Sequence, residues 1–258
     1  MHYKEHNIKS FYEFENIATK FLPKEGLNPF ILRGQADITW NLLPKLARSL
    51  IDKGIDHEPD AIAIERKLYH SFIDNHPSLD NKNDLLHVWE IMQHYGYETR
   101  LLDWTIDPLI ALYFACSTNT DADGAIFVID AAHVKFIQDA RAGFDKDSTD
   151  WIFEQLSKSV RGQSHTAAFA TISSPWPDQR MLNQKSEFTI GTQILADQFQ
   201  FADEIVFSRT ANRSADNSIF QKIIIPARLK DIFMSELNKK GIDEKTVYPT
   251  RSDIVENK

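Results

Sequence analysis

The stretch QHYGYETRLLDWTIDPLIALYFAC, residues 93–116, runs from a polar segment directly into an apolar one. The Asp-Pro pair at 107–108 is typical of a helix cap followed by a first-turn residue, and the apolar run behind it predicts a helix over 109–115. Ahead of the cap, the stretch holds Arg100 and Asp103 close to this core helix. We therefore expect a polar ligand or partner to be held where the helix begins.

The composition indicates a globular protein with its own core. The chain has 258 residues, of which 42% are hydrophobic and 26% charged, and its net charge of -8 weighs against a nucleic-acid-binding chain. It lacks both a run of about 18 apolar residues and a signal peptide, so we expect a cytoplasmic protein without membrane contact. Its one cysteine, Cys116, fits a reducing compartment and a buried apolar role rather than a catalytic one.

Hydrophobic periodicity and turn residues predict both helices and strands. Helices are predicted around 11–21 with Ser10 as N-cap, around 61–72, from Asp84 up to Gly96, over 109–115, and over 228–240. Strands are predicted at 30–33, 125–129, 187–192, 204–208 and 222–225, with the turn-prone NRSADNS at 212–218 before the last of them.

Residues 131–180 are harder to assign. They combine helix signals around Trp151 and Leu156 with a turn-rich stretch that ends in SSPWPDQR, and we interpret the segment as a lid or insertion. No internal repeat or linker divides the chain, so we expect a single α+β domain over residues 1–258.

Arg33 is the first candidate site residue. It ends the apolar run at 30–32 and precedes Gly34, which would let main chain or a ligand approach closely. A guanidinium in this position suits bidentate binding of a phosphate or carboxylate. The alternative is that Arg33 pairs with a carboxylate at the edge of the core.

Gln93 and His94 fall in the last turn of a predicted helix, where the negative end of the helix dipole favours an imidazolium. A protonated His94 could donate to an anionic ligand, and a neutral one could cap the helix carbonyls. The residue types alone do not distinguish between these two roles of His94.

Arg100 and Asp103 lie three positions apart, so a mutual ion pair is the structural alternative to a ligand-binding role for both. Trp104 and Thr105 follow at the predicted helix start. An aromatic face and a hydroxyl at a helix N-terminus would form a cradle for a planar ring and a ribose or phosphate.

Gln184 and Glu187 stand at the start of a predicted strand, where an amide or carboxylate can hold a ribose hydroxyl or stabilise developing positive charge. The alternative for Glu187 is an ordinary surface glutamate. The chain contains no Ser-His-Asp elbow, P-loop, GxGxxG, HExxH or CxxC motif, so we expect neither a Rossmann cofactor nor a metal.

Three segments together resemble the FRG domain, which is named for an aromatic-Arg-Gly motif and marked by a QHYG-x-x-TRLLDWT block. The resemblance extends over about residues 10–250. Two departures are Leu32 at the aromatic position and Ser186 where the family has a glycine. The segments are LRGQADITWNLLPKLAR at 32–48, QHYGYETRLLDWTIDPLIALYFA at 93–115 and NQKSEFTI at 183–190.

A more distant similarity connects the chain to ADP-ribosyltransferases, which place an Arg or His on a first strand, a Ser-Thr-Ser-like turn before an A-x-x-F-A helix, and a Glu or Gln on a later strand. The serine-rich turn is absent here, where Asp103-Trp104-Thr105 precede the helix. It implies an ADP-ribosyltransferase-like mixed or antiparallel sheet with flanking helices, and NAD as substrate. It implies catalytic roles for Arg33, Gln184 and Glu187, and nucleotide binding by Arg33, Gly34, Gln35, Gln93, His94, Arg100, Asp103, Trp104 and Thr105.

On this resemblance we expect an NAD-dependent ADP-ribosyltransferase or NAD glycohydrolase, acting as a bacterial toxin or anti-phage effector. It would have a protein or nucleic-acid acceptor and a neutralising partner protein. The first alternative is a non-enzymatic sensor that binds a nucleotide or a protein. A nuclease is a further alternative, and would need Asp121, Asp123 and Asp130 to hold magnesium.

Overall fold

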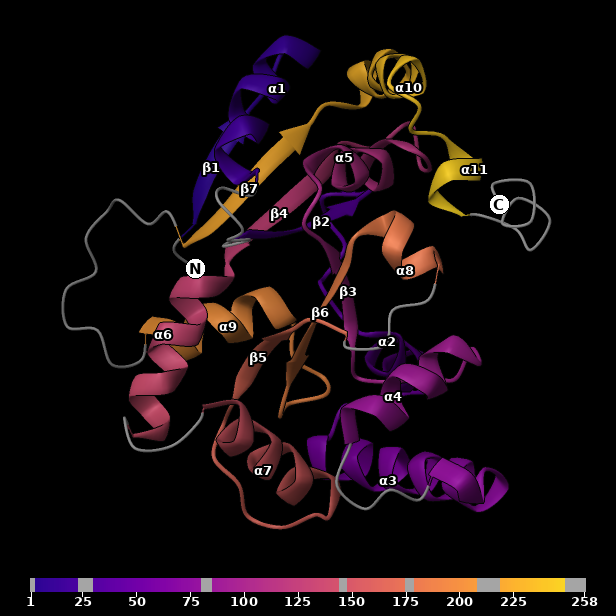
Figure 1. The fold of residues 1–258 in the computed structure, drawn as a ribbon, viewed down its shortest axis with the longest axis vertical. Coiled ribbons are helices and arrows are strands. Elements are labelled where there is room, and N and C mark those ends of the chain that lie inside the picture. The colour runs from indigo at the N-terminus through magenta and orange to yellow at the C-terminus, as the bar shows by residue number, and fades with distance from the viewer. Residues whose placement is uncertain are drawn as a thin grey trace.

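The fold is built on a seven-stranded mixed sheet. A computed structural model describes residues 3–22, 30–79, 85–143, 148–174, 179–207 and 219–248. The strand order is β1-β7-β4-β2-β3-β6-β5 (Figure 1), and neighbours are antiparallel except for the parallel pair β1 and β7. The strands are β1 Lys4–Asn7, β2 Phe30–Gln35, β3 Leu102–Thr105, β4 Gly124–Asp130, β5 Phe169–Ile172, β6 Ser186–Gly191 and β7 Phe220–Ile225.

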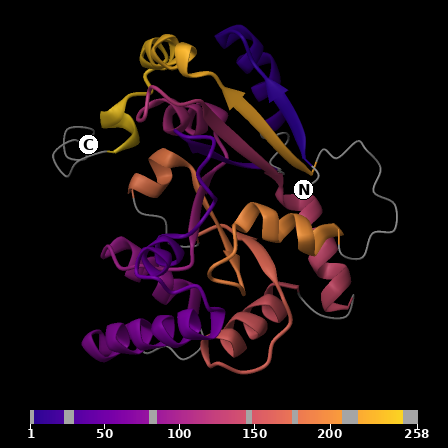
Figure 2. The ribbon, with the colours of Figure 1, turned by 180° about the vertical axis from the view of Figure 1, so that it is seen from behind.

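Helices flank both faces of this sheet, which confirms the predicted mixed sheet with flanking helices (Figures 1 and 2). Among the described residues, none of the helices is both long and apolar enough to cross a membrane. The helices are α1 Phe11–Ala18, α2 Lys45–Asp52, α3 Glu58–Asn75, α4 Leu85–His94, α5 Pro108–Cys116, α6 Ala131–Ala142, α7 Ser148–Val160, α8 Gln179–Gln184, α9 Gln198–Phe207, α10 Lys230–Lys239 and α11 Glu244–Val247.

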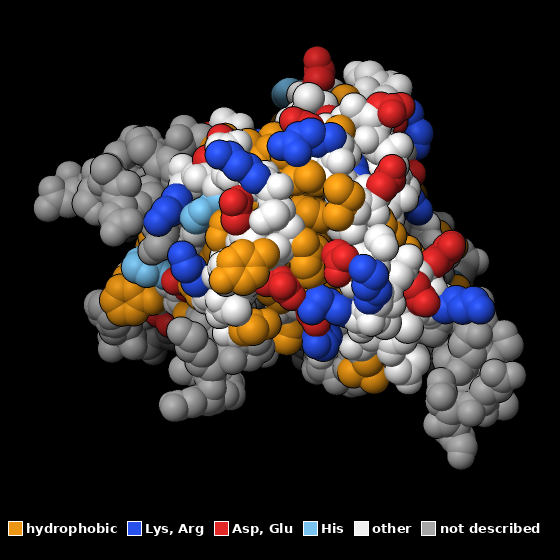
Figure 3. Space-filling model, turned by 90° about the horizontal axis from the view of Figure 1, so that it is seen from above, with side chains coloured by type: hydrophobic (Ala, Val, Ile, Leu, Met, Phe, Trp, Pro, Cys, Tyr) orange, Lys and Arg blue, Asp and Glu red, His pale blue; other side chains and the backbone are white. Residues whose placement is uncertain are grey.

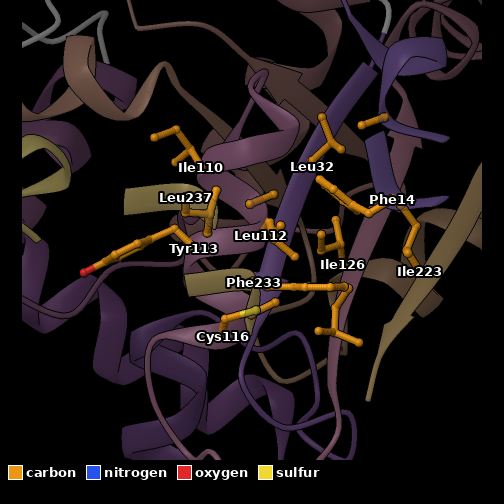
Figure 4. Close-up of a cluster of buried hydrophobic side chains, with 14 of the residues drawn as sticks. Phe14, Leu32, Ile110, Leu112, Tyr113, Cys116, Ile126, Ile223, Phe233 and Leu237 are labelled. Carbon is orange, nitrogen blue, oxygen red and sulfur yellow. The ribbon is translucent and has the colours of Figure 1, made fainter. Parts of the chain in front are cut away.

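Helices α1, α5 and α10 cover one face of the strands β2, β4 and β7. Phe14, Leu112 and Phe233 pack there against Leu32 and Ile126, all of them buried (Figure 4). Above this layer, the outer surface carries charges of both signs around apolar side chains (Figure 3), so this face has no single-sign patch suited to a phosphate backbone.

The rest of the sheet has two further apolar clusters. On the opposite face, Phe199 and Val206 of α9 pack against Phe127 and Trp104. At the β5–β6 end, helices α3, α4 and α7 pack over the sheet, with Trp89 in the centre of that cluster. The sheet, with β2 and β3 near its middle, therefore lies between separate groups of helices.

The two predicted helix N-caps, Ser10 and Asp107, are confirmed. Ser10 accepts a hydrogen bond from the Glu13 N–H at 3.2 Å and caps α1, and Asp107 accepts from the Leu109 N–H at 2.8 Å and caps α5. The predicted helices at 61–72 and 228–240 correspond to α3 and α10. Asp84 and the stretches 23–29 and 212–218 lie outside the described residues.

The predicted strand at 204–208 is wrong, because residues 204–207 form the last turn of α9; Ser208 is outside the described residues. Asp197 accepts hydrogen bonds from the main chain of Phe199 and Gln200 and so starts a helix well before the apolar run. Between residues 198 and 206 only Gln200 and Glu204 are exposed, and their spacing of four places them on one face of the helix. The strands β1, β3 and β5 and the helix α2 were not predicted.

Residues 131–180 contribute α6, α7 and strand β5, and the described part of this segment packs into the core at Leu156 and Phe169. The single-domain organisation and the lid interpretation stay predictions.

Gly34 fixes the approach of α5 to β2. A Cβ at this position would lie only 1.9 Å from the carbonyl oxygen of Ala111. The glycine of the Arg-Gly pair is thus required by helix packing, and a ligand is not needed to explain it.

Arg100 forms a fully buried ion pair with Glu65 of α3. Its Nε donates to Glu65 at 2.6 Å, and its Nη1 donates to the main-chain oxygen of Gly191 at 3.2 Å. The alternative of a mutual pair with Asp103 is not what the structure contains, because Asp103 is exposed and a buried guanidinium needs a buried counterion.

The Arg100→Met variant tests how far the fold depends on this pair. It would leave the Glu65 carboxylate buried without a counterion, and we expect a loss of about 3–5 kcal/mol in the free energy of unfolding, measured by urea denaturation. The double variant Glu65→Leu with Arg100→Met should recover at least half of that loss.

The matched control is Lys239→Met, which breaks the surface pair with Glu236 and should change the free energy by less than about 1 kcal/mol. A double variant as unstable as Arg100→Met alone would show that the hydrogen bonds of Arg100 to main-chain oxygens, not its charge pairing, stabilise the fold.

Candidate functional site

A pocket of about 250 Å³ lies where β2 and β3 separate. These two strands share a single residue pair, Leu32 with Thr105, whereas β2 pairs with β4 along its whole length. The sheet therefore opens beside Arg33 and Gly34, and both residues line the pocket. The other walls come from β3, α5, α8 and the residue after α11.

Arg33 supplies a positive charge to this pocket. Its Nη1 donates to the main-chain oxygen of Asp103 at 2.6 Å, while its buried Nε has no hydrogen-bond partner. In the described part of the chain, Arg33 forms no ion pair with a carboxylate, so the alternative of a core-edge pair is not what the structure contains. Burial lowers the pKa of Arg33, and the negative charge of Asp103 opposes part of this decrease. Arginine is effectively always protonated in proteins, so the charge is kept.

A second cation and two aromatic rings complete the pocket, and none of the three was predicted. The Arg180 guanidinium lies 5.1 Å from the centre of the Tyr248 ring, and Tyr248 meets Phe114 edge to face. The main chain before Tyr248 is held by α8, since Gln184 donates to the Val247 oxygen at 3.1 Å. No local pattern marks these residues, because they meet only in the folded chain.

Trp104 and Thr105 line the pocket, but their polar atoms bond inside the protein. The Trp104 indole N–H donates to Thr189 at 2.7 Å, and its ring belongs to the core. The Thr105 hydroxyl donates to the Gln184 oxygen at 2.7 Å and accepts from the Asp107 N–H. Both residues therefore shape the pocket, and neither offers a free donor to a ligand.

Asp103 is the carboxylate on the pocket wall. Gln93 donates to it at 2.6 Å and in turn accepts from Thr99 at 3.0 Å, so Gln93 positions the carboxylate without lining the pocket. Three other predicted residues lie elsewhere. His94 is exposed at the end of α4, Arg100 is in the core, and Gln35 donates to the Trp40 oxygen.

Gln184 lines the pocket, but Glu187 does not. Glu187 pairs with Trp104 across β3 and β6, so the two side chains lie on the same face of the sheet. The Ser173 hydroxyl lies 2.8 and 2.9 Å from the two carboxylate oxygens of Glu187. Burial raises the pKa of Glu187, and the bond from Ser173 opposes the rise.

The structure also bears on the nuclease and thiol alternatives. Among the described residues, no three His, Cys, Asp or Glu side chains are placed to hold a metal ion. Asp123 accepts from the Ala227 N–H and Asp130 caps α6, which are turn and cap roles. Burial raises the pKa of Cys116 to about 12, so its thiol stays protonated.

The family comparison found the FRG domain at residues 28–124, a shorter stretch than the predicted 10–250. This stretch contains β2, β3 and α5, and with them Arg33 and Asp103, but not Glu187. Comparisons with curated proteins and with solved structures found no match.

The Glu187→Gln variant tests whether the partly buried carboxylate of Glu187 destabilises the fold. Because the folded-state pKa lies above the ordinary value of 4.5, ionisation of Glu187 destabilises the fold at pH 7, and the amide removes that penalty. We expect a higher melting temperature than the parent at pH 7, with a difference that shrinks as the pH falls and is lost below 4.5, where the carboxyl becomes protonated in both states.

The control for this series is Glu236→Gln, which removes a carboxylate from a surface pair and should not raise the melting temperature at pH 7. A Glu187→Gln protein that melts below the parent at pH 7 would mean that the Ser173 bond outweighs the cost of burial.

Proposed function

We propose that this FRG-domain protein binds NAD in the pocket between β2 and β3 and cleaves its nicotinamide–ribose bond, as an ADP-ribosyltransferase or an NAD glycohydrolase. The observation that carries the proposal is Arg33, a guanidinium at a pocket with a buried unpaired N–H and a single hydrogen bond, to a main-chain oxygen. Such a group is complementary to an anionic oxygen.

The charge of the pocket supports a phosphorylated ligand. The chain carries a net charge of -8, yet Arg33 and Arg180 both line this pocket, with Asp103 as the one carboxylate among its lining residues. Two guanidinium groups can bind the two phosphates of a dinucleotide, whose charge they neutralise.

The aromatic walls support a planar ring. Phe114 and Tyr248 line the pocket, and Tyr248 is 40% exposed, so its ring is available for stacking in a way that the buried Trp104 ring is not. At about 250 Å³, the pocket holds only part of a dinucleotide, so the remainder of NAD would extend beyond the pocket mouth.

The strand order supports the resemblance to ADP-ribosyltransferases. The Arg-bearing strand β2, the strand β3 before the A-x-x-F-A helix, and the Glu-bearing strand β6 are direct neighbours in the sheet. Three segments separated by 50 or more residues in the sequence thus lie side by side, and the first two of them line the pocket.

Two carboxylates are candidates for stabilising the positive charge that develops on the ribose as nicotinamide leaves. Asp103 is on the pocket wall. Glu187 is on the next strand and would have to exchange its bond from Ser173 for one to the ribose. Its partly buried position strengthens electrostatic stabilisation, and the resemblance assigns it this role, so we keep Glu187 as the catalytic residue. The acceptor and a role as a toxin or in phage defence stay predictions.

Nicotinamide release from NAD by the purified chain tests the proposal, with NAD affinity measured by calorimetry on the same samples. Arg33→Ala should weaken NAD binding about tenfold or more, because it removes charge-assisted hydrogen bonds to phosphate. Arg228→Ala, an exposed arginine remote from the pocket, is the matched control and should bind normally.

Glu187→Gln should lower the release rate about 100-fold while changing the NAD affinity little, because it removes charge stabilisation and keeps the shape. If Asp103→Asn has this effect instead, the catalytic role moves to the pocket-wall carboxylate. Binding without release would favour the sensor alternative, which is consistent with Glu187 not being among the residues that line the pocket. No binding would refute the proposal.

A further inference from the structure

Strand β5 forms one edge of the sheet, and within the described ranges no strand pairs with its outer side. In an antiparallel ladder, residues whose main-chain groups bond the neighbouring strand alternate with residues whose groups point away. The Thr192 N–H donates to the Ala168 oxygen at 2.9 Å, so Ala168 bonds toward β6. By alternation, the main-chain N–H and C=O of Phe169 and Thr171 point outward.

A groove of about 240 Å³ follows this outer edge, between α6 and α7. Every residue of β5 lines it, and its side walls include Val134 of α6 and Ile152 and Phe153 of α7. Neighbouring strands in a sheet lie about 4.8 Å apart. A groove with a strand edge as its floor and a helix on each side therefore suits one extended chain.

Gln138 of α6 also lines the groove and is 1% exposed, yet neither its amide nitrogen nor its amide oxygen has a hydrogen-bond partner. Buried polar groups are rarely left unpaired in folded proteins, because each one destabilises the fold. A carboxamide presents a donor beside an acceptor, and each residue of an extended chain presents its N–H and C=O on the same side. Gln138 is thus complementary to the main chain of an extended segment.

We propose that this groove binds an extended segment of another protein, which adds to the sheet as a strand beside β5. The main chain of the segment bonds to Phe169 and Thr171, and the Gln138 carboxamide bonds one further N–H and C=O. Its side chains are uncharged where they face Ile152 and Phe153, because a charge there would lose its hydration without a counterion. Strand addition is an established mode of peptide recognition, and this proposal does not depend on NAD chemistry.

The position of the groove links it to the pocket. Ser173 lines the end of the groove, and its hydroxyl holds the Glu187 carboxylate. A segment bound along β5 therefore lies against the residue that positions Glu187.

A displayed library of random octapeptides, selected on the full chain, tests the proposal. We expect the enriched peptides to be rich in β-branched and aromatic residues. They should slow hydrogen exchange of the Phe169 and Thr171 amides at least tenfold, measured by NMR. A synthetic copy of the best peptide, methylated on alternate main-chain nitrogens, keeps the side chains but loses donors and should bind at least tenfold more weakly.

Two variants locate the binding site. Thr171→Pro removes an outward N–H at an edge position, where proline is tolerated, and should weaken peptide binding at least tenfold. Gln138→Leu keeps the size of the side chain and removes both unpaired atoms, so it should raise the melting temperature of the free protein and weaken peptide binding at least fivefold. Gln200→Leu, on the exposed side of α9, is the control and should bind as the parent does.

The proposal is overturned if no peptide is enriched, if the enriched peptides bind the Gln138→Leu protein as well as the parent, or if they protect amides away from β5. If Thr171→Pro does not fold, as judged by circular dichroism, the methylated peptide and Gln138→Leu decide the question.

Discussion

The buried ion pair between Arg100 and Glu65 is the interaction on which the β3–β6 half of the structure depends. It lies just before β3, and it joins that strand to α3 and, through the Gly191 oxygen, to the end of β6. A shift of β3 along its axis would separate Arg100 from Glu65 and leave two buried charges unpaired, so the ion pair fixes where β3 begins. The positions of Asp103 and Trp104, three and four residues later, follow from it.

The opening of the sheet between β2 and β3 is the second constraint, and it creates the pocket. On the β2 side, the close approach of α5 at Gly34 fixes the strand against one helical layer. On the β3 side, Arg100 fixes the strand against another. The two strands share one residue pair, and the Arg33 bond to the Asp103 oxygen joins them beside the pocket.

Unpaired buried polar atoms mark both sites discussed above. Arg33, whose buried Nε has no partner, lines the pocket between β2 and β3, and Gln138 lines the groove along β5. Buried polar groups are rarely left unpaired in folded proteins, and both of these belong to residues that line a cavity, where a ligand can supply the missing hydrogen bonds. The pocket is cationic and aromatic, which suits a nucleotide. The groove is a strand edge between two helices, with apolar side chains on the α7 side and Gln138 on the α6 side, which suits a polypeptide.

The sequence by itself determined the helix caps at Ser10 and Asp107 and the strands around Arg33 and Glu187, because these depend on contacts within a few residues. The sequence analysis was wrong at α9, because a short apolar run fits the period of a strand as well as that of a helix. The cap at Asp197 is what distinguishes the two. Only the tertiary structure decided that Glu65 pairs with Arg100, that Arg180 and Tyr248 complete the pocket, and that β5 is an edge strand. Strand order and buried charge pairing are set by contacts between segments far apart in the chain, and no local period carries that information.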